Sequence, residues 1–137
     1  MIGRHVLLGP EFRQLRYRSA WAIYAAIVVM GSVPGVRADI GDYASGFVLH
    51  SFAYAILTFL LFTGGTGHAR QRAIKAVLTV MTMGAIDELV QSFFPYRGAA
   101  VTDWLVDSGA SIVTSAVLWA FLPDRHFSCS RRTEDMA

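Results

Sequence analysis

Polar and ionisable side chains occur at helical spacing in otherwise apolar parts of this sequence. His50 and Tyr54 are four residues apart, and Glu88 and Gln91 are three apart. Residues with these spacings share one face of an α-helix. Imidazole, carboxylate and guanidinium groups can bind a polar ligand or transfer protons. The candidate ligand-binding residues are His50, Tyr54, Glu88, Gln91, Arg97, Asp103 and Asp107.

Glu88 and His50 are the candidate catalytic residues if the protein is an enzyme, because a carboxyl group and an imidazole can act as general acid and base. A divalent cation is an alternative occupant, since carboxylate and imidazole groups are common metal ligands. The sequence contains no closely spaced ligand motif of the His-Glu-x-x-His type. We therefore expect no metal and no other cofactor. The sequence also lacks the combination of basic and aromatic residues that binds single-stranded nucleic acid, so no nucleic-acid partner is expected.

The composition excludes a soluble globular domain. Of the 137 residues, 54% are apolar and only 16% are charged, and the mean hydropathy is +0.44. Soluble chains carry roughly 25% charged residues, and a chain of this length cannot hide so much apolar surface from water. Disordered chains need low hydrophobicity and high net charge, whereas the net charge here is +2. Lipid is therefore the expected solvent.

Four segments are long and apolar enough to cross a bilayer, which takes about 20 residues. We expect an all-α integral membrane bundle whose four transmembrane helices cover about 19–36, 46–63, 73–94 and 103–122. Proline and glycine end these segments at Pro34, at Gly64, at Pro95 and at Pro123. The alternative for the first segment is a cleaved signal peptide. Its uncharged run of 18 residues exceeds the roughly 7–15 residues of a signal core.

The basic residues predict the orientation. Ten of the 12 Lys and Arg residues lie in the N-terminal arm (1–18), around the second connection or in the polar tail (123–137), and the other two are Arg37 and Arg97. Basic loops stay in the cytoplasm, where they also contact anionic lipids. We expect a multi-pass membrane protein with both termini cytoplasmic. The transmembrane domain (19–122) then carries its polar site on the outside.

Two acidic residues lie within the third apolar segment. Glu88 precedes Pro95 by seven residues, which is about 10 Å at 1.5 Å per residue. A carboxylate at membrane depth costs about 2.5–3.5 kcal/mol and usually faces the bundle interior, where it meets a partner. Asp87 points about 100° away from Glu88, and the simplest expectation is that it reaches the membrane surface. Gly84 would allow another helix to come close.

Structural roles are alternatives for several of these residues. Asp103 is well placed as the N-cap of the fourth helix, and Asp107 is favoured there by the helix dipole. His50 and Tyr54 have ring types that suit the membrane interface. Arg97 can neutralise Glu88 or contact a lipid phosphate. Small residues of the fourth helix permit close contact within the fold or in a homo-oligomer: Ala110, Ser111, Thr114 and Ser115.

The motif around Glu88 resembles the VanZ-like family of small bacterial membrane proteins. The family pattern Glu-x-x-Gln-x-Phe, then Pro-x-Arg, then Asp and a further Asn or Asp four residues on matches Glu88, Gln91, Phe93, Pro95, Arg97, Asp103 and Asp107. His50 and Tyr54 resemble the family's His-Phe-x-x-Tyr, with Ser51 in place of Phe. The family commonly has Asp-Lys where this chain has Gly46 and Phe47.

The resemblance implies a four-helix protein of the bacterial inner membrane, part of the cell envelope, whose polar site faces outward. The family is named for low-level resistance to the glycopeptide teicoplanin. The expected function is binding of a lipid-linked cell-wall precursor or a lipoglycopeptide. One alternative is an intramembrane enzyme that acts on a lipid head group with Glu88 as general acid or base. A second alternative is a small oligomeric transporter.

Overall fold

The computed structural model describes residues 8–34, 46–95 and 100–122. These residues contain helices and no strand. A single 3-10 turn, η1 (Pro10–Phe12), leads into four long helices: α2 (Arg13–Ser32), α4 (Gly46–Gly64), α5 (Ala69–Ser92) and α6 (Val101–Phe121). The predicted all-α class and the four predicted helices are therefore confirmed in the described part of the chain.

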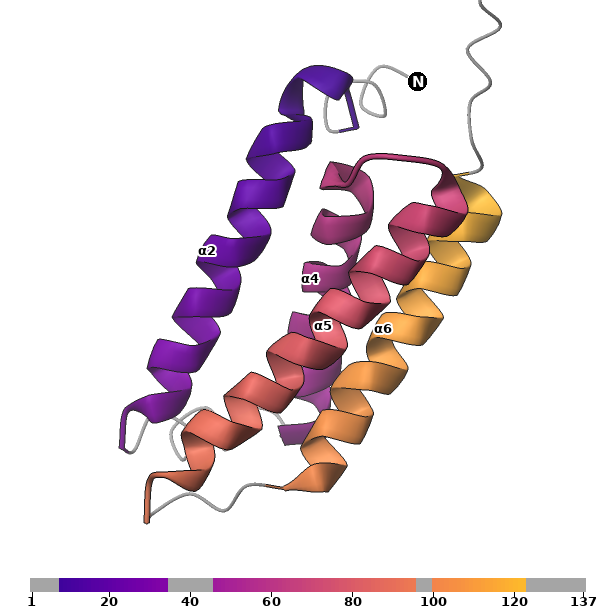
Figure 1. Ribbon diagram of the computed structural model, residues 1–137. Coiled ribbons are helices and arrows are strands. Elements are labelled where there is room, and N and C mark those ends of the chain that lie inside the picture. The colour runs from indigo at the N-terminus through magenta and orange to yellow at the C-terminus, as the bar shows by residue number, and fades with distance from the viewer. Residues whose placement is uncertain (1–7, 35–45, 96–99, 123–137) are drawn as a thin grey trace, which may run out of the picture.

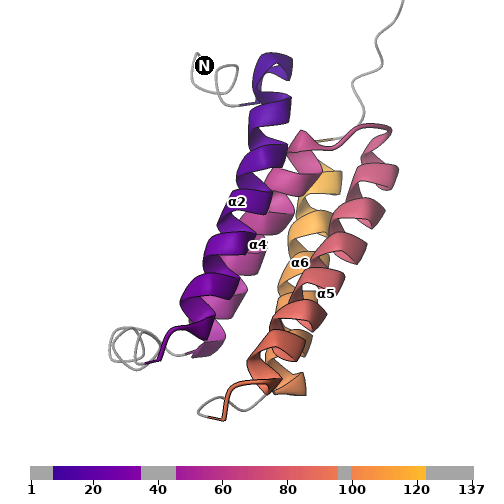
Figure 2. The ribbon, with the colours of Figure 1, turned by 60° about the vertical axis from the view of Figure 1, so that its left-hand side comes forward.

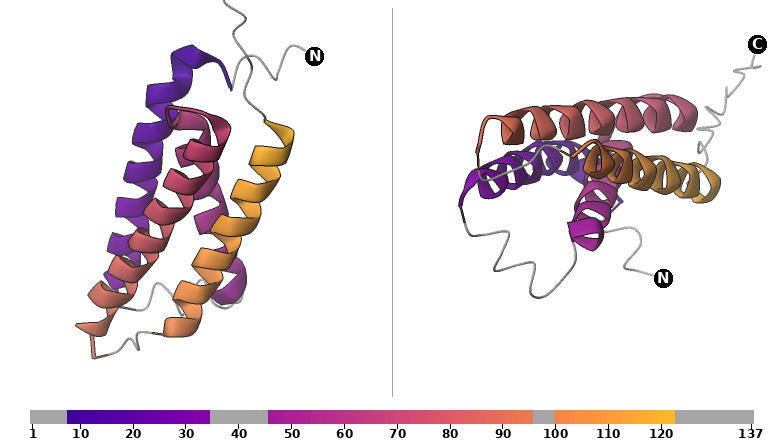
Figure 3. Two further views of the ribbon diagram at one scale, coloured as in Figure 1. Left: turned by 45° about the vertical axis from the view of Figure 1, so that its right-hand side comes forward. Right: turned by 90° about the horizontal axis from the view of Figure 1, so that it is seen from below.

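The four long helices run side by side and alternate in direction along the chain (Figures 1 and 2). Helix α6 packs against both α4 and α5, and α2 packs mainly against α4. In the left view of Figure 3, the starts of α4 and α6 lie at the same end of the bundle as the end of α5. Residues from the first turns of α4 and α6 and the last turns of α5 can therefore meet at one end.

The helix boundaries differ from the sequence prediction at several points. Helix α2 ends at Ser32 rather than residue 36, because Val33 is extended (φ −85°, ψ 125°) and a residue that precedes proline disfavours the helical conformation. Helices α2 and α5 begin at Arg13 and Ala69, earlier than the predicted residues 19 and 73. The prediction followed the apolar stretches, whereas the flanking arginine and glutamine residues are also good helix formers.

The interior of the bundle is small, and much of its outside is apolar. The buried apolar residues include Tyr54, Leu57, Phe62, Val80 and Met83. Large apolar side chains point outward from every long helix, and the most exposed are Phe52, Phe93, Val101 and Phe121. Two helices, Phe47–Gly64 and Val101–Phe121, are long and apolar enough to cross a membrane. Apolar side chains thus occupy both the interior and much of the outer surface of the described bundle.

The charges of the described residues separate toward opposite ends of the bundle. All six Lys and Arg residues lie in the first turns of α2 and α5, and this end is called the basic end: Arg13, Arg16, Arg18, Arg70, Arg72 and Lys75. Four of the five acidic residues lie at the opposite end, called the acidic end: Asp87, Glu88, Asp103 and Asp107. Glu11 is the exception. The middle of the described bundle carries no charged residue.

A glycine sets the distance between α2 and α4. A Cβ atom built on Gly64 would lie 2.7 Å from the backbone nitrogen of Tyr17, whereas one built on Gly109 would meet no atom within 4 Å. Only glycine lets the backbone of α2 come so close to the end of α4.

The substitution Gly64→Ala is expected to destabilise the bundle by about 1–3 kcal/mol, the usual cost of overpacking. Gly109→Ala is the matched control and is expected to be neutral or to stabilise by up to about 1 kcal/mol through helix propensity. Thermal unfolding in detergent measures both. Equal melting temperatures for the two variants would show that the approach of α2 to α4 is not tight.

Candidate functional site

The centre of the acidic end is a histidine between two aspartates. His50 lies in the second turn of α4, and its Nδ1 atom is 2.9 Å from Oδ1 of Asp107 in α6. Its Nε2 atom is 3.8 Å from Oδ2 of Asp103, one turn earlier in α6. The four-residue spacing of the two aspartates places both on the face of α6 that looks toward α4. Each ring nitrogen of His50 therefore faces a carboxylate.

Burial differs among these three side chains. The side chain of Asp107 is 1% exposed, and those of His50 and Asp103 are 15% and 23% exposed. A proton on Nδ1 of His50 donates to Asp107 and fixes the orientation of the ring. Nε2 and Asp103 are then the groups that can meet an incoming molecule. Asp107 acts behind them as a buried hydrogen-bond acceptor.

A second pair connects α4 to α5. The hydroxyl group of Tyr54 donates to Oδ2 of Asp87 at 3.3 Å, and both residues are buried. The ring of Tyr54 lies parallel to the imidazole of His50, with the centroids 6.0 Å apart. The predicted shared face of His50 and Tyr54 is thus observed, and it brings the two hydrogen-bonded pairs into contact.

The expectation that Asp87 reaches the surface is wrong, since only 2% of this residue is exposed. The buried face of α5 follows Val80, Gly84, Asp87 and Gln91, with the spacing of three and four residues that marks one side of a helix. That spacing was visible in the sequence. Asp87 was not assigned to the buried face of the helix, because a charged residue was not expected there.

Gly84 brings α5 close to α6, as the sequence predicted. A Cβ atom on Gly84 would lie 3.2 Å from Oδ2 of Asp107 and 3.2 Å from the indole of Trp104. Trp104 also donates from Nε1 to the carbonyl oxygen of Met81 at 2.9 Å. This contact holds Asp107 against α5 while its other oxygen accepts from His50.

Glu88 is bound to the start of α6. Its Oε2 atom accepts a hydrogen bond from the backbone N–H of Ala100 at 2.6 Å. Ala100 is the N-cap residue of α6, and no side chain of its own caps the helix. The suggested N-cap role of Asp103 is therefore wrong, because α6 begins at Val101 rather than at residue 103 and Asp103 lies within the first turn. A carboxylate at this position also interacts favourably with the helix dipole.

Several buried polar atoms at this end have no hydrogen-bond partner among the described residues. They include the second oxygen of Asp87, Asp107 and Glu88, Oε1 of Gln91 and the hydroxyl groups of Ser108 and Ser111; the hydroxyl group of Ser115, one turn farther along α6, also has none. Buried polar groups without partners are uncommon and often mark the place of a water molecule or ligand. The sequence analysis treated Ser115 only as a small contact residue, whereas the spacing also places Ser111 on the face of Asp103 and Asp107.

The structure thus gathers His50, Tyr54, Asp103 and Asp107 into one cluster and adds Asp87 to it, and we call these five residues the acidic cluster. Glu88 and Gln91 lie at the same end on α5. The predicted site residue Arg97 lies outside the described residues. In the three described ranges, no group of three or more His, Cys, Asp and Glu side chains is arranged to hold a metal ion.

Comparison with protein-family models, with curated proteins and with solved structures finds no match for this chain.

Replacing Glu88 with alanine is expected to loosen the start of α6, because it removes the acceptor for the N–H of Ala100. A hydrogen bond to a charged group contributes about 1.5–3 kcal/mol, so amide exchange over residues 100–104 should increase roughly tenfold or more. Glu88→Gln keeps an acceptor oxygen and should retain most of the protection. Hydrogen exchange read by mass spectrometry distinguishes the variants. Unchanged exchange in Glu88→Ala would contradict the capping role.

Proposed function

We propose that this chain is a four-span inner-membrane protein of VanZ-like type that binds an amphipathic ligand of the cell envelope at its acidic end. The observation that carries the proposal is the acidic cluster. It is a contiguous set of polar groups at one end of a bundle with an apolar outside, and the described Lys and Arg residues all lie at the other end.

The separation of charge supports the four-span topology. The charged residues of α2 lie in its first two turns, and those of α5 lie in its first two and last two turns, so residues 76–86 of α5 form an uncharged middle that can sit in hydrocarbon beside α4 and α6. Because basic segments remain in the cytoplasm, the basic end is assigned to the inside. The acidic cluster then opens to the outside, where cell-wall precursors and glycopeptides are found.

The chemistry of the cluster indicates what the polar part of a ligand must offer. Carboxylate oxygens accept hydrogen bonds, so the matching groups are sugar hydroxyls, amide N–H groups or an ammonium group. Exposed apolar side chains surround this end, namely Phe47, Phe93 and Val101. A ligand with a polar head and a hydrocarbon chain can contact both. Lipid-linked cell-wall precursors and lipoglycopeptides such as teicoplanin have this composition.

A second function, an intramembrane enzyme acting on a lipid head group, is favoured by one observation. Asp107 fixes His50 through Nδ1 and leaves Nε2 on the more exposed side, which is how a carboxylate orients a general base. His50 is a better candidate for this role than Glu88, because Oε2 of Glu88 accepts the N–H of Ala100. The third alternative, transport, requires polar groups along the whole path across the membrane. The described acidic cluster lies at one end of the bundle only, so binding is favoured over transport.

The topology can be measured with the single cysteine of the chain, Cys129. A membrane-impermeant maleimide applied to intact cells is expected to leave Cys129 unlabelled until the inner membrane is permeabilised. In a Cys129→Ser background, Val101→Cys at the acidic end should be labelled in intact cells, because Val101 is exposed. The reverse pattern, or labelling of both positions from one side, would exclude the proposed orientation.

Ligand binding is tested with Asp103→Asn and His50→Asn against a matched control. Loss of one charge-assisted hydrogen bond of about 1.4 kcal/mol weakens binding tenfold, so both variants should hold teicoplanin or a polyprenyl-linked disaccharide at least tenfold less well. Glu11→Gln removes one negative charge at the basic end and should bind as the wild type does. Native mass spectrometry in detergent gives the bound fraction.

Equal binding by all four proteins would overturn the assignment of the ligand site to the acidic cluster. Conversion of an added lipid to a product of different mass by the wild type, absent in His50→Asn, would establish the enzymatic alternative in place of simple binding.

A further inference from the structure

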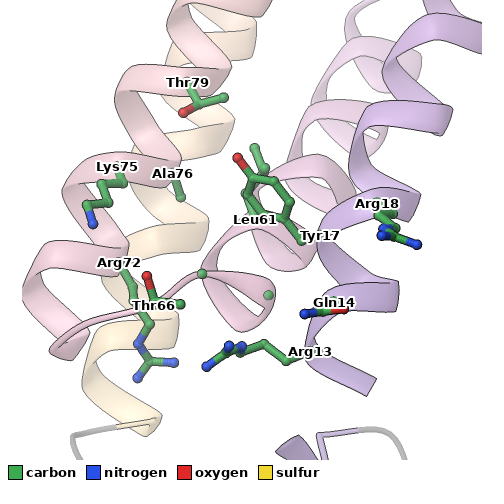
Figure 4. Close-up of a pocket in the computed structure, with 12 residues that line it drawn as sticks. Arg13, Gln14, Tyr17, Arg18, Leu61, Thr66, Arg72, Lys75, Ala76 and Thr79 are labelled. Carbon is green, nitrogen blue, oxygen red and sulfur yellow. The ribbon is translucent and has the colours of Figure 1, made fainter. Parts of the chain in front are cut away.

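The basic end contains a cavity of about 410 Å³ between the first turns of α2 and α5 and the end of α4 (Figure 4). Four of the residues that line it are cationic, Arg13, Arg18, Arg72 and Lys75, and none of the lining residues is acidic. Tyr17, Thr66 and Thr79 add hydroxyl groups, and Leu61 and Ala76 form an apolar wall. The lining therefore combines cations, neutral hydrogen-bond donors and hydrocarbon in one concave site.

Two of the four cations converge. Figure 4 shows the guanidinium groups of Arg13 from α2 and Arg72 from α5 pointing into the mouth of the cavity, whereas the charged groups of Arg18 and Lys75 point away from its centre. Arg72 is held in place by Phe62, whose ring centroid lies 4.7 Å from the guanidinium carbon. Its buried Nε atom has no hydrogen-bond partner among the described residues.

A structural role accounts for a neighbouring arginine but not for these two. Arg16 donates to the carbonyl oxygen of Thr63 at 3.0 Å and to that of Gly9 at 3.2 Å, so it binds the carboxyl end of α4. Glu11 lies close enough to Arg16 to interact with its charge. Arg13 and Arg72 instead bring two like charges to one opening whose lining supplies no carboxylate, and a bound anion would offset their repulsion.

We propose that this basic cavity binds a phosphate ester. The guanidinium groups of Arg13 and Arg72 are planar forks of N–H donors, and each can bind two oxygen atoms of a phosphate group at once. The hydroxyl groups of Tyr17, Thr66 and Thr79 can donate further, uncharged hydrogen bonds. The phosphate comes from an anionic phospholipid of the adjacent leaflet or from a soluble phosphate compound. The site is independent of the acidic cluster and lies at the opposite end of the bundle.

The test compares two double variants with the same loss of charge. Arg13→Gln/Arg72→Gln removes the converging forks, and Arg18→Gln/Lys75→Gln removes the two cations that point away. Native mass spectrometry measures binding of phosphatidylglycerol, with diacylglycerol, which carries no phosphate group, as the reference. The wild type and Arg18→Gln/Lys75→Gln are expected to retain one phosphatidylglycerol molecule, and Arg13→Gln/Arg72→Gln should bind it at least tenfold more weakly.

Competition with millimolar inorganic phosphate identifies the source of the phosphate group. Displacement of the lipid indicates a soluble phosphate ligand, and persistence of the bound lipid indicates that the ligand is a phospholipid.

Equal weakening in the two double variants would show diffuse attraction to a basic surface and would overturn the proposal, as would unchanged binding in both. Arg13→Lys/Arg72→Lys keeps the charge but removes the forks, so it should weaken binding by about threefold. This variant provides the test if the glutamine variant fails to fold. Binding of teicoplanin at the acidic end should be unaffected by the substitutions at Arg13 and Arg72, so failure of one site is distinguishable from failure of the other.

Discussion

The hydrogen bond between His50 and Asp107 connects α4 to α6, and the arrangement of the acidic end depends on it. A carboxylate without a partner is costly inside an apolar bundle, so Asp107 needs a donor at a fixed place. Gly84 lets Asp107 lie directly against α5. Tyr54, whose ring is stacked on His50, donates to Asp87 and so connects α4 to α5 as well. Three helices are thus held in register by a small set of polar contacts rather than by a large apolar core.

Much of this arrangement is present in the sequence as spacing. The four apolar segments predicted the four long helices, and the four-residue steps from His50 to Tyr54 and from Asp103 to Asp107 predicted the faces that meet. The role of Glu88 was not predictable in the same way, because its partner is a backbone N–H 12 residues away. That contact joins the last turns of α5 to the N-cap residue of α6, and no periodicity within a single helix indicates it.

The basic cavity illustrates a different reason why sequence analysis falls short. Clustered arginines beside a membrane segment predict orientation and attraction to anionic lipids, but their number does not distinguish a solvated surface from a site. The distinction arises because Gly64 allows α2 to approach α4 while Phe62 orients Arg72. Arg16 is used to bind the end of α4, and Arg13 and Arg72 face the opening between the helices. The same residue type therefore has two different roles within one turn of α2.

The hydroxyl groups of the helices also bear on how the chain is assembled. Thr58 and Thr63 donate to carbonyl oxygens four residues earlier in α4, at 2.7 Å each, so these polar groups of α4 are satisfied before any neighbour arrives. Helix α5 differs, since Asp87 and Glu88 obtain their donors from Tyr54 of α4 and from the start of α6. In the proposed topology, Thr58 and Thr63 bring no unsatisfied hydroxyl group into the bilayer with α4, whereas Asp87 and Glu88 acquire their donors only when α4 and α6 flank α5. Integration during synthesis is then cooperative, with the third span retained by the second and the fourth.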